Sequence, residues 1–146
     1  MLPKIQTFAW RLLRGALATG KRVGKYSKFI NSECDICGVV EDEMHIFFLC
    51  QNSKAAWFSK PWFIKTEFIA QHNTSVPSII QFILSSNHPN ANLVNLYTFL
   101  WSIWKARNDS RFNKRQVHPS QIFVHYNALM KDTSLVRQVN LQGTAN

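Results

Sequence analysis

All three cysteines of the chain lie in one short stretch with a histidine, at the spacing Cys34-x2-Cys37-x7-His45-x4-Cys50. Two thiolates two residues apart can bind one ion from a tight turn, and Gly38 lets the backbone fold back after them. Sulfur and imidazole ligands favour Zn²⁺ over Mg²⁺ or Ca²⁺. Four protein ligands leave no open position, so the spacing predicts a structural zinc site. The alternative is three buried free thiols and an unrelated histidine.

The last two ligands set a condition on the helix that carries them. At about 100° per residue, a regular α-helix places Cys50 about 140° around its axis from His45. The two side chains could not then reach one ion, so we expect a break or a widened turn near Leu49. The remaining histidines have no partner at ligand spacing, and surface or capping roles are expected for His72, His88, His118 and His125.

The elements that must position these ligands are predicted to be helices. Apolar residues recur at helical spacing from Ile5 to Leu17, and Thr19-Gly20 is expected to end that helix. Shorter helices are predicted over 21–29, 42–48, 53–58 and 78–84. The strongest pattern, over 93–112, places Trp101 and Trp104 on its buried face, and a last helix begins at 118–120. Little of the sequence has the alternation of a strand.

These patterns predict a mainly α protein: a small helical domain organised around one Cys3His zinc site, followed by a helical C-terminal segment. The expected organisation is a zinc-binding domain over 1–70, then a polar linker with a short helix over 71–92. A helical segment over 93–137 and a polar, frayed tail over 138–146 complete the chain.

Charge is distributed unevenly along the chain, which has a net charge of +9. Residues 1–30 contain seven basic and no acidic residues, and residues 31–43 contain five acidic and no basic ones. A positive field of this kind attracts polyanions, of which nucleic acid is the commonest. The residues predicted to contact phosphate are Lys21, Arg22, Lys25 and Lys28; the alternative is a solvated basic face. The basic run after Trp104 is a second, weaker candidate.

A known family shares the order of four segments in this chain: LPKIQTFAWRLLRGALATGKRV, CDICG, EDEMHIFFLC and SKAAWF. Together they resemble the zinc-binding domain that follows the reverse transcriptase in plant non-LTR (LINE-type) retroelements. The residues in common with that family's pattern are Pro3, Lys4, Phe8, Trp10, Arg11, Leu12, Ala16, Leu17, Thr19, Cys34, Cys37, Gly38, Glu41, His45, Phe47, Cys50 and Trp57. The segment LWSIWKARNDSRFN, residues 100–113, resembles the spacer that often precedes a ribonuclease H domain.

The resemblance implies a zinc module that helps a retroelement protein handle RNA or DNA, with a reverse transcriptase domain as a second partner. Catalysis is not expected, because the only acids after Glu67 are Asp109 and Asp132, and two isolated carboxylates do not form a two-metal site. We therefore expect a zinc-binding, nucleic-acid-binding, non-catalytic module. The alternative is a zinc-stabilised scaffold that docks on a polymerase or another protein.

Two further classes are not expected as partners. No apolar run approaches the ~20 residues that span a bilayer, so a membrane partner is not expected. A small-molecule substrate is not expected either, because the sequence has no nucleophile elbow and no glycine-rich phosphate loop. An odd number of clustered cysteines does not suit a secreted disulfide framework, so an intracellular location is expected.

Overall fold

The protein is helical throughout the part that the computed structural model describes, which is the backbone of residues 1–144 and the side chains of residues 1–133. The helices, in chain order, are α1 (Pro3–Leu13), α2 (Gly20–Gly24), the π-helix η1 (His45–Leu49), α3 (Gln51–Phe58), α4 (Thr66–Ala70), α5 (Val76–Leu84), α6 (Leu93–Phe112) and α7 (Pro119–Thr144). Within these residues the only strand-like pairing is an isolated bridge between Glu33 and Val40. The predicted mainly α class is confirmed.

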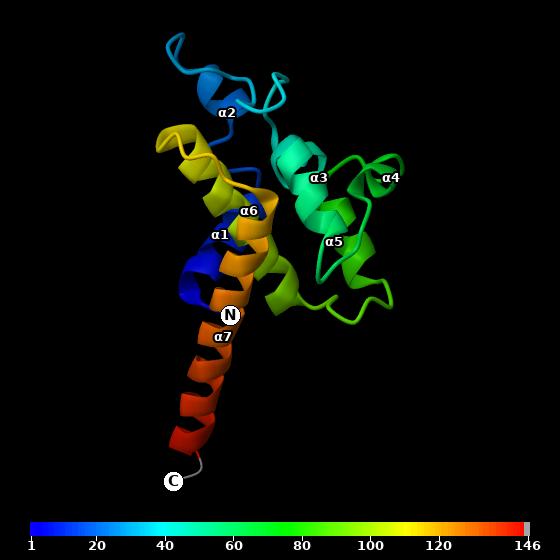
Figure 1. Ribbon diagram of the computed structural model, residues 1–146, viewed down its shortest axis with the longest axis vertical. Coiled ribbons are helices and arrows are strands. Elements are labelled where there is room, and N and C mark those ends of the chain that lie inside the picture. The colour runs from blue at the N-terminus through cyan, green and yellow to red at the C-terminus, as the bar shows by residue number, and fades with distance from the viewer. Residues whose placement is uncertain (145–146) are drawn as a thin grey trace.

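The long helix α6 is the centre of the arrangement. It packs against α1, α7 and η1, while α3 packs against η1, α4 and α7. In Figure 1, α2 and the loops beside it lie at one end of the molecule, and α7 points toward the opposite end. The segment that carries the four predicted ligands therefore joins α2 to the helical body.

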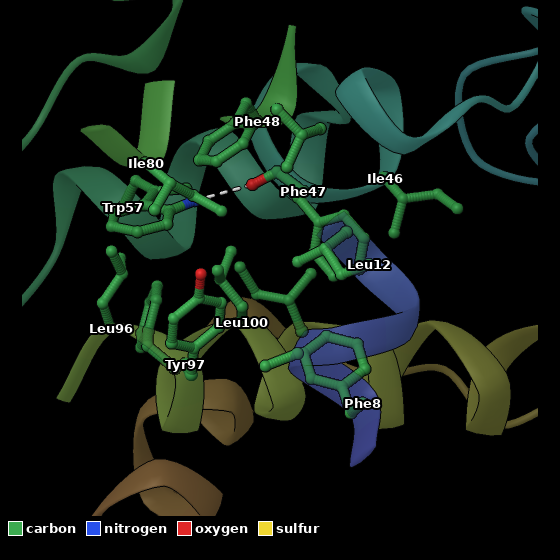
Figure 2. Close-up of a cluster of buried hydrophobic side chains, with 14 of the residues drawn as sticks. Phe8, Leu12, Ile46, Phe47, Phe48, Trp57, Ile80, Leu96, Tyr97 and Leu100 are labelled. Carbon is green, nitrogen blue, oxygen red and sulfur yellow. Dashed lines mark hydrogen bonds between the residues drawn. The ribbon is translucent and has the colours of Figure 1, made fainter. Parts of the chain in front are cut away.

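One aromatic-rich core connects the parts of the chain. Figure 2 shows Phe8 of α1, Phe47 and Phe48 of η1, Trp57 of α3 and Leu100 of α6 in one cluster. Segment 71–92, expected as a polar linker, adds the buried side chains of α5 to the same core: Val76, Ile79, Ile80 and Ile83. The zinc-ligand segment therefore shares one core with α5 and α6.

The predicted bounds of the first two helices are wrong. α1 ends at Leu13, because Gly15 has a φ of 64°, a left-handed conformation that stops a helix. Thr19 begins α2 and does not end α1: its hydroxyl accepts a hydrogen bond from the Arg22 amide at 3.2 Å. α2 itself ends at Gly24 and does not continue to 29.

The later helices agree more closely with the prediction. The helix expected over 93–112 is α6, with the same bounds. Trp101 and Trp104 are half-buried and pack against the core, with both rings near that of Phe8. Helix α4 had no clear signal in the sequence. The backbone of α7 continues to Thr144, through most of the tail expected over 138–146, and residues 145–146 lie outside the described residues.

Candidate metal centre

The first two ligands lie on a tight turn closed by backbone hydrogen bonds. The Cys34 amide donates to the carbonyl of Val39 at 2.7 Å, and the Gly38 amide donates to the carbonyl of Cys34 at 2.9 Å. Gly38 has a φ of 71°, which a residue with a side chain adopts only under strain. This glycine lets the chain reverse directly after Cys37, so that both thiols can serve one site.

The other two ligands bracket the π-helix η1. The Cys50 amide donates to the carbonyl of His45 at 2.6 Å, an i to i+5 hydrogen bond that defines a widened turn. The wider turn brings residue 50 back over residue 45, which a regular α-helix would not do. The break or widened turn expected near Leu49 is therefore present, and its geometric reason holds.

The four side chains converge on one point. Their ligand atoms all lie within 4.8 Å of one another, and the Sγ of Cys50 is 3.9 Å from the Sγ of both Cys34 and Cys37. A tetrahedral zinc ion with Zn–S bonds of about 2.3 Å would place its sulfurs about 3.8 Å apart. In addition, His45 Nε2 is buried with no hydrogen-bond partner among the described residues. The donor set and its spacing fit zinc.

The buried thiols of Cys34 and Cys50 share one proton, and Cys34 is the one biased toward ionisation. A hydrogen bond with the Cys50 thiol lowers the pKa of Cys34 to about 3, against an opposing effect of burial, while the same bond and burial raise the pKa of Cys50. The Gln51 amide points at the Cys37 sulfur, with N and Sγ 3.4 Å apart. A bound cation would replace the proton shared by Cys34 and Cys50.

The surroundings of the cluster are closed. The cavity beside it, bounded by Cys34, His45 and Arg107 among others, has a volume of about 40 Å³. That is room for a few water molecules and too small for an organic substrate. A Cys3His set that supplies all four ligands, beside a cavity too small for a substrate, is typical of a structural zinc site.

The widened turn leaves buried carbonyls that side chains of α3 and α4 satisfy. The Ser53 hydroxyl donates to the carbonyl of Ile46, the Trp57 indole N–H to that of Phe47 at 2.7 Å, and the Thr66 hydroxyl to that of Phe48 at 2.6 Å. Figure 2 draws the bond between Trp57 and Phe47. Because unpaired buried carbonyls are costly, these three donors hold η1 in its unusual geometry.

Replacing Trp57 with phenylalanine is expected to destabilise the fold more than the same change at Trp62. Both indoles are buried in one cluster, with ring centroids 5.2 Å apart, but the Trp62 N–H has no hydrogen-bond partner among the described residues. Trp57→Phe leaves the Phe47 carbonyl unpaired, so its loss in unfolding free energy should exceed that of Trp62→Phe by about 1–3 kcal/mol. Urea unfolding of both variants measures the difference, and equal losses would contradict this role for Trp57.

A buried carboxylate ties the zinc loop to α6. Glu41 is 3% exposed, and its Oε1 accepts from the Gly20 amide at 2.9 Å. Arg107 donates to both of its carboxylate oxygens, from Nε to Oε2 at 3.1 Å, and Arg111 donates to Oε1 at 3.2 Å. Arg111 also reaches the carbonyls of Asn31 and Glu33. The start of α2, the zinc loop and α6 thus meet at one ionic network.

This network corrects one expectation from the sequence. The basic run after Trp104 was a candidate for phosphate contact, but Arg107 and Arg111 have side chains that are each only 9% exposed. Both are committed to Glu41 and to loop carbonyls. Lys105, Lys114 and Arg115 of that run remain exposed.

The four basic residues predicted to contact phosphate divide into three environments. Lys21 and Lys25 are exposed and line a groove of about 500 Å³. Arg22 lines the same groove, but it pairs with Glu43 at 2.8 Å and donates to the carbonyl of Leu17. Lys28 lies outside the groove, in the exposed loop after α2. The groove also contains Arg14, which the sequence analysis did not single out.

The remaining histidines play no part in the cluster. His118 Nδ1 bonds to the Ser120 hydroxyl at 2.8 Å at the start of α7, as expected for a capping role. His88 stacks on Trp62, with ring centroids 5.3 Å apart.

The turn, the widened helix and the closed ligand set together define a structural zinc-binding module built into a helical body. Residues 1–57 of the chain match the family described as zinc-binding in reverse transcriptase. The match confirms the resemblance to a reverse-transcriptase zinc-binding domain over this part of the chain. It ends at Trp57, whose indole N–H donates to η1. No curated protein and no solved structure matches the chain significantly. Among the described residues, no helix has the length and apolar character to cross a membrane.

Proposed function

We propose that the protein is a zinc-stabilised nucleic-acid-binding module, derived from a retroelement protein of the plant LINE type and without catalytic activity of its own. The observation that supports this most directly is the groove of about 500 Å³ lined by Arg14, Lys21, Arg22 and Lys25. Zinc would stabilise the fold, and the groove would bind the nucleic acid. All three cysteines are free thiols in the structure, which agrees with a reducing, intracellular setting.

The charges in the groove leave cations for a polyanion. Asp42 and Glu43 also line it, but the Glu43 carboxylate is paired with Arg22. Lys21 and Lys25 are exposed and form no ion pair within the described residues. Phosphates that neutralise such lysines release condensed counterions, which gives affinity with little dependence on sequence.

The test is a salt titration of binding to RNA and DNA oligonucleotides. Lys21→Glu combined with Lys25→Glu is expected to weaken binding and to reduce the slope of log affinity against log salt by about 2. The matched control is Lys60→Glu combined with Lys131→Glu, two exposed lysines outside this groove, which gives the same net charge. Equal effects of the two double variants, or no binding by the parent, would contradict the proposal.

One observation favours the alternative, a scaffold that docks on a polymerase or another protein. Phe58 and Phe68 are more than half exposed, and the Lys65 ammonium lies 5.5 and 5.8 Å from their ring centroids. Phe63 nearby is 64% exposed. Exposed apolar side chains grouped in this way are typical of protein contact surfaces. If the parent binds neither RNA nor DNA, this scaffold function is preferred.

A further inference from the structure

The loop that follows α2 presents two aromatic side chains to solvent. Within residues 25–30, Tyr26 is 86% exposed and Phe29 is 99% exposed. Lys25 and Lys28, both exposed, alternate with them along the chain. In Figure 1 this loop stands at the end of the molecule beyond α2, away from the helical core. Because both rings are almost fully exposed, they add little buried area to the folded state. Their exposure suits a contact with a ligand.

Close packing and hydrogen bonds hold both ends of the loop that carries the two rings. Gly24 lies so close to Ser32 that a Cβ on the glycine would be 2.8 Å from the serine Cβ. Arg111 donates to the carbonyl of Asn31, just after the loop. Inside the loop, the Phe29 amide donates to the Ser27 hydroxyl at 3.2 Å. A held loop loses less conformational entropy on binding than a free one.

The loop continues directly from the basic groove. Lys25 lines the groove and immediately precedes Tyr26. Arg14, on another wall of the groove, stacks on Trp10, with its Cζ 4.3 Å from the ring centroid, and Trp10 is itself 56% exposed. Cations for phosphates and flat rings for bases therefore adjoin one another.

We propose that Tyr26 and Phe29 stack on unpaired bases, so that the ligand of this surface is single-stranded nucleic acid whose phosphates follow the groove. The inference rests on the proposed function and adds a requirement for unpaired bases. Aromatic rings stack on any base because every base has a π face, whereas the bases of a duplex are already stacked on one another. The combination of a positively charged groove with exposed rings is the arrangement that single-strand binders use.

The distribution of acidic residues favours the same path. Glu33 and Asp35 are exposed on the zinc loop, on the far side of residues 25–30 in the sequence. Their charges repel phosphate, whereas residues 1–30 contain no acidic residue. Asp42 and Glu43 also line the groove, but Glu43 is paired with Arg22, so the remaining cations Arg14, Lys21 and Lys25 outnumber the one remaining carboxylate.

The test compares single-stranded and duplex probes with the full-length zinc-loaded protein. The probes are uridine and thymidine oligonucleotides of about 16 nucleotides, and a duplex of equal length. Tyr26→Ala combined with Phe29→Ala is expected to weaken single-strand binding at least about fivefold and to leave duplex binding unchanged. Zinc content and helicity should not change, because neither ring is buried. Tyr26→Phe combined with Phe29→Tyr keeps both rings and should bind as the parent does.

Phe68→Ala is the matched control, since Phe68 is also exposed beside a lysine but lies far along the chain from the groove. It should leave binding unchanged. The inference is overturned if the double alanine variant binds single strands as tightly as the parent, if Phe68→Ala is equally damaging, or if the parent prefers duplex. In each of these cases, a loss of nucleic-acid binding in the Lys21→Glu and Lys25→Glu double variant would still support the proposed function. The two proposals therefore fail independently.

Discussion

Removal of zinc is expected to unfold most of the described chain, and not only the loop between Cys34 and Cys50. Zinc binding at a structural site contributes on the order of 10 kcal/mol to the free energy of folding. This is comparable to the whole net stability of a typical domain. η1 begins at the ligand His45 and ends just before the ligand Cys50, and its Phe47 and Phe48 are fully buried in the common core. From the sequence alone, only the ligand segment would be expected to fail. Circular dichroism and tryptophan fluorescence during titration with a chelator measure how far the loss extends.

Variants of the ligands should reproduce the effect of the chelator. The parent is expected to bind one equivalent of zinc per chain, and Cys37→Ser and His45→Asn are expected to lose most of it, together with helicity. His72→Asn is the matched control, because His72 is an exposed histidine outside the cluster. Elemental analysis gives the zinc content of each protein. A metal-free chain that keeps its full helicity and a cooperative thermal transition would refute the structural role of the site.

The parts of the fold that the sequence predicts are those that local rules determine. The apolar face of α1 is visible in the spacing of Ile5, Phe8 and Leu12, all of which are buried. The start of α6 is marked by Asn92, whose side chain accepts a hydrogen bond from the Asn95 amide at 3.0 Å. The end of α1 was missed because apolar residues continue past Gly15, and periodicity alone does not show that its backbone has left the helix.

The metal centre was predictable for the same reason. Its four ligands lie within seventeen residues, so their types and spacing are visible without tertiary information. The widened turn follows from the requirement that His45 and Cys50 reach one point. The donors that stabilise this turn were not predictable. Ser53, Trp57 and Thr66 bond to carbonyls 7, 10 and 18 residues away, and no sequence pattern marks a carbonyl that a π-helix leaves unpaired.

The ionic network at Glu41 depends on tertiary structure alone. Its arginines are 66 and 70 residues away in the chain. Sequence gives the charge of such residues but not their partners, so Arg107 and Arg111 were grouped with exposed cations. Both arginines lie outside the segment 1–57 that matches the zinc-binding family. The loop that carries the zinc ligands is consequently tied to α6 by contacts that do not require a metal.

Replacement of Glu41 with glutamine is expected to lower the free energy of unfolding by about 3–5 kcal/mol, the usual cost of breaking a buried ion pair from one side. The amide keeps the shape of the carboxylate but leaves Arg107 and Arg111, both nearly buried, without a counter-charge. The Gly20 amide also loses a charged acceptor. Urea unfolding of the zinc-loaded protein measures the loss.

Glu43→Gln is the matched control for this prediction. Its partner Arg22 has a side chain that is 36% exposed, so the pair is worth at most about 1 kcal/mol. If both variants cost the same, Glu41 is no more than a surface charge. The rate of zinc transfer to a chelator tests a second role of the network. If the network restrains the zinc loop against α6, Glu41→Gln should speed this transfer and Glu43→Gln should not. Unchanged transfer with lowered stability would show that the network supports the core without restraining the metal loop.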